Sequence, residues 1–161
     1  MDNVNREENM KKYNNYRELF PRLNRAVKNE FYFEAIFIAY AIVEDRTESV
    51  LRHLGKWEAY QRQCAARRGY PTITGKVNLI RQAARKSTSP AAPYFSDGIL
   101  DRFMEWKERR NQKIHELMNH PFSAEELQEL AQTGKTLART ISNRTESMKR
   151  AIARAQAAQE S

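Results

Sequence analysis

Residues 31–43 read FYFEAIFIAYAIV, and Glu34 is the sole polar residue among them. A helix that is apolar on every side is expected to be buried on most sides. Two arrangements satisfy this expectation: a helix at the centre of a bundle, or a helix that contacts its own core on one face and a second protomer on the other. The helical pattern continues to Leu54, and Gly55 is the expected stop.

The rest of the chain is also helical in character. It has 161 residues with only five Gly and five Pro, and no run alternates apolar and polar residues as strands do. Length and composition predict a single all-α domain, an antiparallel helical bundle of four to six helices over residues 13–158, preceded by a flexible polar arm over residues 1–12. Further helices are expected at residues 20–29, 56–68, 76–86, 100–118 and 123–159.

Turn-forming residues separate these helices. Glycine and proline place a loop at residues 69–75, and Thr74 is the expected cap of the helix that follows. The Pro/Ser-rich residues 87–96 are expected to be irregular and long enough to form a functional loop. Ser96 or Asp97 is then the expected cap of helix 100–118.

The last helix has the clearest start in the sequence. Ser123 and Glu126 form a capping box, and Phe122 with Leu127 form the hydrophobic staple around it. Its pattern predicts a helix to about residue 159, with a bend near residues 133–134.

Helix 100–118, LDRFMEWKERRNQKIHELM, carries the residues of greatest chemical interest. Its apolar stripe is interrupted by Arg110, Asn111 and His115. Asn111 and His115 are four residues apart and share a face, and the long Arg110 side chain reaches the same side. Polar, ionisable groups that interrupt a core-facing stripe are typical of functional sites. The inward residues expected here are Leu100, Phe103, Met104, Ile114, Leu117 and Met118.

The RNQKIH segment resembles the Arg-x4-6-His signature of the HEPN superfamily, and the helix order over residues 19–155 is similar to that family's architecture. The resemblance implies a metal-independent endoribonuclease of toxin–antitoxin, phage-defence or prophage context, with no cofactor. It also implies a homodimer with a shared cleft, and a cognate antitoxin or defence protein as partner. One subgroup has a tyrosine two residues after the histidine, where this chain has Leu117, so that tyrosine's role does not transfer.

The residue types suit such a reaction independently. RNA cleavage without a metal needs a base, an acid and a positive charge on the developing phosphorane. His115 supplies the proton roles, Arg110 the charge, and Asn111 orientation. A symmetric dimer would bring two sets to one cleft. Glu44 is either part of a solvated helical turn or a partner that pairs with Arg110 or orients His115.

The net charge of +8 is concentrated in one segment. Residues 59–96 contain seven Lys or Arg and no Asp or Glu, with Tyr60, Tyr70, Tyr94 and Phe95 interleaved. This pattern suits either RNA binding or a solvated basic surface without a ligand. The expected nucleic-acid contacts are Arg67, Arg68, Lys76, Arg81 and Arg85.

Other classes of protein are disfavoured by the sequence. The single Cys64 excludes an internal disulfide and a cysteine-rich zinc site, and no histidine and carboxylate spacing predicts a metal. The polar first residues do not resemble a signal peptide, and no apolar run approaches the roughly 20 residues that span a bilayer. A cytoplasmic location is expected. The alternatives to a nuclease are a non-catalytic HEPN-like module that binds nucleic acid or protein, and a structural helical adaptor.

Overall fold

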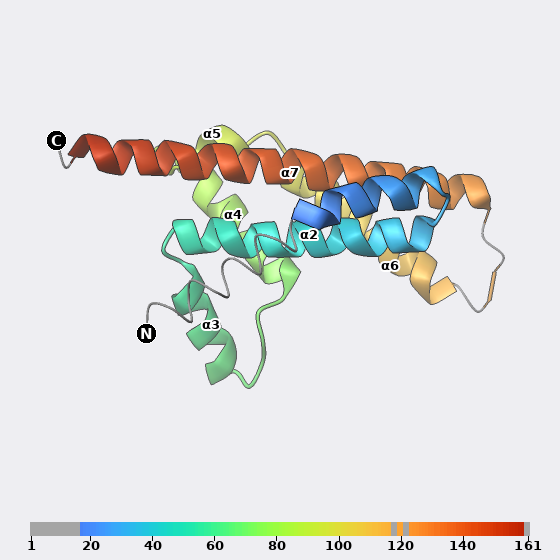
Figure 1. Cartoon of the computed structure of the whole chain (residues 1–161). Coiled ribbons are helices and arrows are strands. Elements are labelled where there is room, and N and C mark those ends of the chain that lie inside the picture. Colours follow the sequence, from blue (N-terminus) through green and yellow to red (C-terminus); the bar gives the residue numbers. More distant parts are fainter. Residues whose placement is uncertain (1–16, 117–118, 121–122, 160–161) are drawn as a thin grey trace.

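The computed structural model describes residues 17–116, 119–120 and 123–159, and these residues form a helical bundle (Figure 1). The expected polar arm and the side chains of Leu117, Met118 and Phe122 lie outside this part of the chain. Residues 17–28 are helical. The helices that follow are α2 (Tyr32–His53), α3 (Trp57–Ala66), α4 (Ile73–Ala84), α5 (Ala92–Phe95), α6 (Ile99–Glu116) and α7 (Ala124–Gln159).

The sequence prediction of an all-α bundle is confirmed for the described residues. They form one more helical segment than the four to six expected, because the one-turn α5 lies inside the stretch expected to be irregular. Proline at the start of that turn suits its first helical positions, where no backbone donor is needed.

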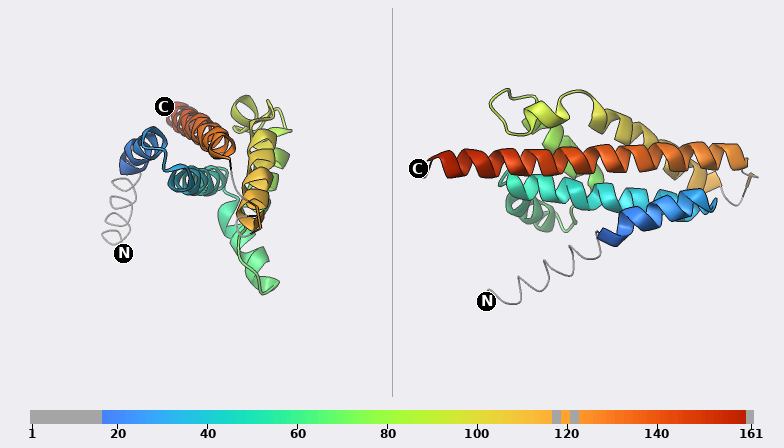
Figure 2. Two further views of the ribbon diagram at one scale, coloured as in Figure 1. Left: turned by 90° about the vertical axis from the view of Figure 1, so that its right-hand side faces the viewer. Right: turned by 45° about the horizontal axis from the view of Figure 1, so that its top comes forward.

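The long helices α2 and α7 lie side by side at the centre of the bundle (Figure 2). They run parallel, because Ala39 packs against Gly134 near their starts and Arg46 bonds Glu146 further along both. Two pairs of consecutive helices run antiparallel, as expected: residues 17–28 with α2, and α6 with α7 (Figure 1). In the end-on view, helix 17–28 lies on one side of the central pair and α4, α5 and α6 on the other.

The inner face of α2 forms the centre of the core. Its buried residues recur at helical spacing, so the apolar segment 31–43 is buried on one side. Phe33 and Phe37, four residues apart, lie on another, open face and are 36% and 54% exposed, and Phe31, just before the helix, is 58% exposed. The helix lies at the centre of the bundle, as in the first arrangement expected from the sequence, but the single chain does not bury segment 31–43 on most sides. Large exposed rings on an amphipathic helix are typical of a binding surface.

Trp106 of α6 connects that helix to α7. Its indole Nε1 donates a hydrogen bond to the Leu130 carbonyl oxygen at 2.8 Å. A Cβ atom on Gly134 would lie 2.5 Å from Cζ2 of the Trp106 ring. Gly134, which the sequence suggested as a bend, therefore sits inside one continuous helix and gives the ring space to pack.

Several helix ends follow the sequence closely. Gly55 adopts a φ of +65°, and its N–H donates to the Arg52 carbonyl, which ends α2 where expected. Asp97 Oδ1 accepts from the Ile99 N–H at 3.3 Å, as one of the two expected caps of α6. Ser123 Oγ accepts from the Glu126 N–H at 3.1 Å, as the capping box predicts. The expected cap of α4 was wrong: Thr72, not Thr74, accepts from the Gly75 N–H.

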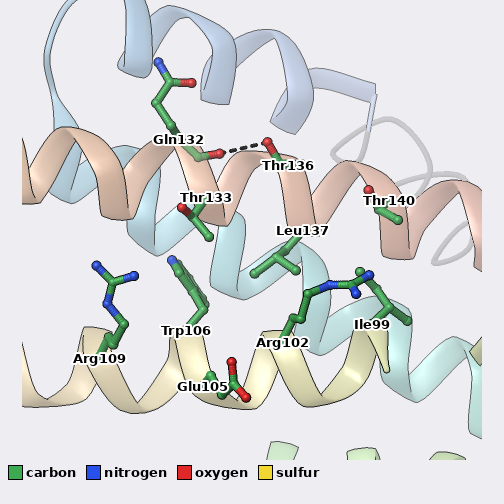
Figure 3. A pocket seen from close by; sticks show the side chains of 10 residues that line it. All are labelled: Ile99, Arg102, Glu105, Trp106, Arg109, Gln132, Thr133, Thr136, Leu137 and Thr140. Atoms are coloured by element: carbon green, nitrogen blue, oxygen red, sulfur yellow. Dashed lines mark hydrogen bonds between the residues drawn. The ribbon is translucent and has the colours of Figure 1, made fainter. Parts of the chain in front are cut away.

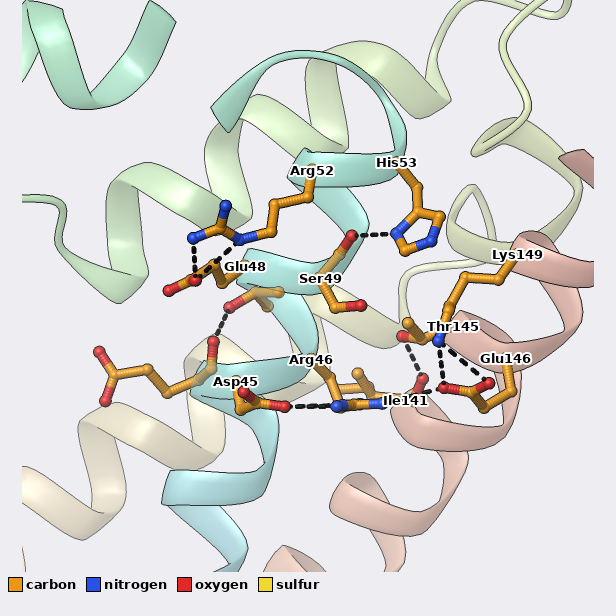
Figure 4. Close-up of polar contacts among 12 residues, drawn as sticks. Asp45, Arg46, Glu48, Ser49, Arg52, His53, Ile141, Thr145, Glu146 and Lys149 are labelled. Carbon is orange, nitrogen blue, oxygen red and sulfur yellow. Dashed lines mark hydrogen bonds and ion pairs between the residues drawn. The ribbon is translucent and has the colours of Figure 1, made fainter. Parts of the chain in front are cut away.

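An ion-pair network joins α2 to α7 at their second halves (Figure 4). The buried Arg46 donates to Glu146 at 2.9 Å and also pairs with Asp45. Lys149 reaches the same Glu146 carboxylate at 3.0 Å. Because a buried guanidinium is costly without such partners, this network fixes the register of the central pair.

Within the described ranges, no helix has both the length and the apolar character needed to cross a bilayer.

Candidate active site

Arg110 lies at the point where the buried stripe of α6 reaches the open face of α2. It follows Phe103 by seven residues and Trp106 by four, so it continues their stripe. Its guanidinium carbon lies 4.4 Å from the centroid of the Tyr40 ring and 5.3 Å from that of Phe37. Cations over aromatic faces at these distances are attracted by the ring quadrupole. Two rings of α2 therefore hold the Arg110 head in place.

Asn111 completes the support of Arg110. Its Oδ1 accepts a hydrogen bond from Arg110 Nη1 at 2.9 Å. Arg110 Nε is buried and has no hydrogen-bond partner among the described residues. The sequence predicted an orienting role for Asn111, and in the single chain the side chain that it bonds is that of Arg110.

His115 stands apart from these two residues. It is exposed in the last turn of α6, and within the described ranges it makes no hydrogen bond to Arg110 or Asn111. Five residues along a helix separate it from Arg110 by roughly 7.5 Å of axial rise. The structure thus brings together Arg110 and Asn111, and one chain by itself does not gather all three residues around one point.

Tyr40 belongs to the site, and the sequence reasoning missed it. Burial and the nearby Glu44 carboxylate raise the pKa of the Tyr40 hydroxyl, while Arg110 acts in the opposite direction. The phenol therefore stays protonated near neutral pH, and its hydroxyl is able to donate a hydrogen bond. The signal was present in the sequence, since Phe33, Phe37, Tyr40 and Glu44 recur at helical spacing on one face, but the apolar run hid it.

Glu44 does not pair with Arg110. Its carboxylate lies 3.6 Å from Lys76 Nζ, which is also 4.0 Å from Glu48 and 5.4 Å from the centroid of the Trp57 ring. Lys76 is only 4% exposed. Its inclusion among the nucleic-acid contacts is therefore corrected: a buried, paired ammonium holds α4 to α2 and is not free for a phosphate.

The other expected basic contacts lie on the surface to different degrees. Arg81 pairs with Asp101 and is partly covered. Arg67, Arg68 and Arg85 are exposed, and none of them has an ion-pair partner within the part of the chain that the structure describes. Tyr70, which follows the first two, is 79% exposed. Figure 1 shows that α3, which precedes these residues, projects away from the α2–α7 pair.

A groove of about 510 Å³ runs along the other side of α6, between α6 and α7 (Figure 3). Ile99, Trp106 and Leu137 form its apolar part, and Arg102, Glu105 and Arg109 rise from α6 beside them; four polar residues of α7, Gln132, Thr133, Thr136 and Thr140, complete it. Arg109 is engaged by Glu129 at 3.1 Å. None of the predicted catalytic residues lines this groove.

The described residues include no group of three or more His, Cys, Asp or Glu side chains that could hold a metal ion. Comparison of the chain with protein-family models, with curated proteins and with solved structures gives no match.

Proposed function

We propose that this protein is a metal-independent endoribonuclease of HEPN type, active at a cleft between two copies of the chain, in a toxin–antitoxin, phage-defence or prophage setting. The observation that supports this most directly is the placement of Arg110. Its guanidinium is held by two aromatic rings and Asn111 at the open edge of the bundle. A fixed, planar cation at a surface is suited to a phosphate with negative charge developing on it.

In the proposed reaction, the 2′-oxygen of the RNA attacks the adjacent phosphorus, and the bond from phosphorus to the 5′-oxygen breaks. His115 of one copy takes the 2′-OH proton, and His115 of the other copy gives a proton to the leaving 5′-oxygen. Arg110 stabilises the phosphorane. The products are a 2′,3′-cyclic phosphate and a 5′-hydroxyl.

The geometry of the single chain is the reason for proposing two copies. One chain supplies one histidine at this site, and that histidine is exposed and separate from Arg110 and Asn111. A twofold axis beside the second half of α6 would bring two arginines and two histidines to one cleft. Sedimentation velocity is expected to show a homodimer.

The activity is tested by incubating the purified chain with tRNA and with mRNA in EDTA. The wild type is expected to cleave and to leave 2′,3′-cyclic ends, and His115→Ala and Arg110→Ala are expected to lose about 10² to 10⁴ in rate. His53→Ala is the matched control, because His53 is also exposed at a helix end and, among the residues that the structure describes, bonds only the Ser49 carbonyl of its own helix. A wild type as inactive as His115→Ala, or equal losses in His53→Ala, refutes the proposal.

The second candidate function is a non-catalytic HEPN-like module that binds nucleic acid or a partner such as an antitoxin. The exposed Arg67, Arg68 and Tyr70 favour it, since they form a basic surface with a free aromatic ring. Low-salt RNA binding without cleavage would support it. Changing both arginines to alanine would then weaken binding and reduce the slope of log K against log salt by about one for each phosphate that the protein no longer neutralises.

A further inference from the structure

The ring of Phe37 is the most unusual surface feature beside Arg110. It lies on the open face of α2 and is 54% exposed. One cation, Arg110, lies 5.3 Å from the ring centroid. Covering a large apolar ring that is exposed to water lowers the free energy, and a planar group can cover the whole face of the ring. Because a guanidinium lies beside the ring, the covering group is expected to carry a negative charge next to its planar part.

The face of α2 that carries Phe37 is closed at the end where Glu44 lies. Phe37, Tyr40 and Glu44 follow each other along it at helical spacing. At Glu44 the face is closed by Lys76 of α4, whose ammonium lies 3.6 Å from the carboxylate. The carboxylate is therefore engaged with Lys76, and no ion pair links Arg110 to an acid among the described residues.

We propose that Phe37 is a base-stacking residue, on which an unpaired base of the RNA lies while Arg110 contacts the neighbouring phosphate. This inference rests on the proposed function and narrows its substrate to single-stranded or looped RNA. Base and phosphate are adjacent within a nucleotide, as ring and guanidinium are adjacent here. Aromatic rings beside cations bind single strands in this way, because every base has a face to stack. Bases inside a duplex are already stacked and cannot reach the ring.

A second copy of the chain fits the Phe37 surface less well than RNA does. Covering Phe37 with a protein surface would also desolvate Arg110, whose Nε is already buried without a partner. A buried guanidinium without an acid is strongly unfavourable. A phosphate brings the missing negative charge together with the base.

The test uses the full chain with His115→Ala, so that the RNA stays intact, and a short single-stranded RNA that carries one 2-aminopurine. Stacking on Phe37 is expected to quench the probe, and Phe37→Leu in the same background is expected to remove the quench and weaken binding about tenfold. The matched control is Phe31→Leu, the same change at a ring that is 58% exposed and has no cation over it in the described part of the chain. The same probe inside a duplex is expected to bind more weakly and to stay unquenched.

Three results would overturn the inference: equal quenching in Phe37→Leu and Phe31→Leu, duplex binding as tight as single-strand binding, or loss of a dimer in Phe37→Leu by sedimentation. The last result would make the ring a contact between two protein chains. The outcome is separable from the nuclease proposal. Cleavage by wild type without Phe37-dependent quenching removes only the stacking role, whereas Phe37-dependent quenching without any cleavage by wild type supports stacking and removes only the nuclease.

Discussion

The two halves of α6 share one helical stripe but have opposite roles. In the first half, Ile99, Leu100, Phe103 and Trp106 are all buried. In the second half, the stripe continues with Arg110, which is partly exposed and rests on the rings of α2. Residues at the same helical spacing therefore form part of the core where neighbouring helices cover α6, and one of them is a surface cation where α6 is less covered. The buried half gives the exposed half a fixed position.

The largest expected effect is on stability, from the buried half. Trp106→Ala is expected to lower the free energy of unfolding by about 3–5 kcal/mol, because it removes a fully packed ring and its bond to the Leu130 carbonyl. Urea unfolding followed by circular dichroism measures it. A loss below about 1 kcal/mol would mean that the first half of α6 does not anchor the helix.

Gly134→Ala tests the packing of the Trp106 ring from the side of α7. The added Cβ would lie 2.5 Å from the Trp106 ring, and overpacking of this kind costs about 1–3 kcal/mol. Alanine's better helix propensity offsets up to about 1 kcal/mol of that loss, so a lower melting temperature is expected. Gly69→Ala is the control, because a Cβ there meets nothing closer than 3.7 Å. Equal melting temperatures for the two variants would contradict the close packing.

Arg110→Leu tests the exposed half. Stability is expected to change by less than about 1 kcal/mol, because leucine keeps apolar contact with the two rings and removes a buried, unpartnered Nε. Cleavage of RNA is nevertheless expected to be lost. Thermal unfolding and the EDTA cleavage assay, run on the same preparation, separate the two effects. A large fall in the melting temperature of Arg110→Leu would contradict this expectation and show that Arg110 is needed for stability, as the residues of the buried half are.

The smallest expected effect concerns the start of α6. Arg144 of α7 donates to the Asp97 carboxylate, with Nη2 to Oδ2 at 2.8 Å, and lowers the Asp97 pKa from 3.8 to about 2. Because the folded pKa is the lower one, this stabilisation is present above about pH 4 and is lost as the pH falls toward 2. For an exposed pair it is worth less than about 1 kcal/mol. In Asp97→Asn, the free energy of unfolding, measured by urea titration, is expected to vary less with pH in this range. The same dependence on pH as in the wild type would show that the pair contributes nothing to stability.

Much of the fold was predictable because local signals specify helices. Gly55, Asp97 and Ser123 act at their helix ends as the sequence indicates. The parallel course of α2 and α7 was not predictable, because periodicity shows which face is buried but not against which helix it packs. The one-turn α5 was also missed, since the Pro/Ser-rich stretch around it indicated a loop.

The candidate site was predicted only in part for the same reason. The spacing on α6 identified Arg110, but its support comes from Phe37 and Tyr40, some seventy residues earlier. Counting charges placed Lys76 on the surface, because the count cannot see that Glu44 and Glu48 meet it from another helix. Whether His115 acts with Arg110 stays a prediction.

The stacking of Arg110 on two rings of α2 also changes how a chain of this kind is recognised. An arginine and a histidine at a fixed separation occur often by chance in a basic protein. The structure adds a second condition to the Arg and His motif. Two aromatic residues three positions apart on α2, here Phe37 and Tyr40, must lie with their ring faces against the guanidinium. A pattern that couples both segments is more selective than the short motif, and it discriminates on the basis of a physical contact.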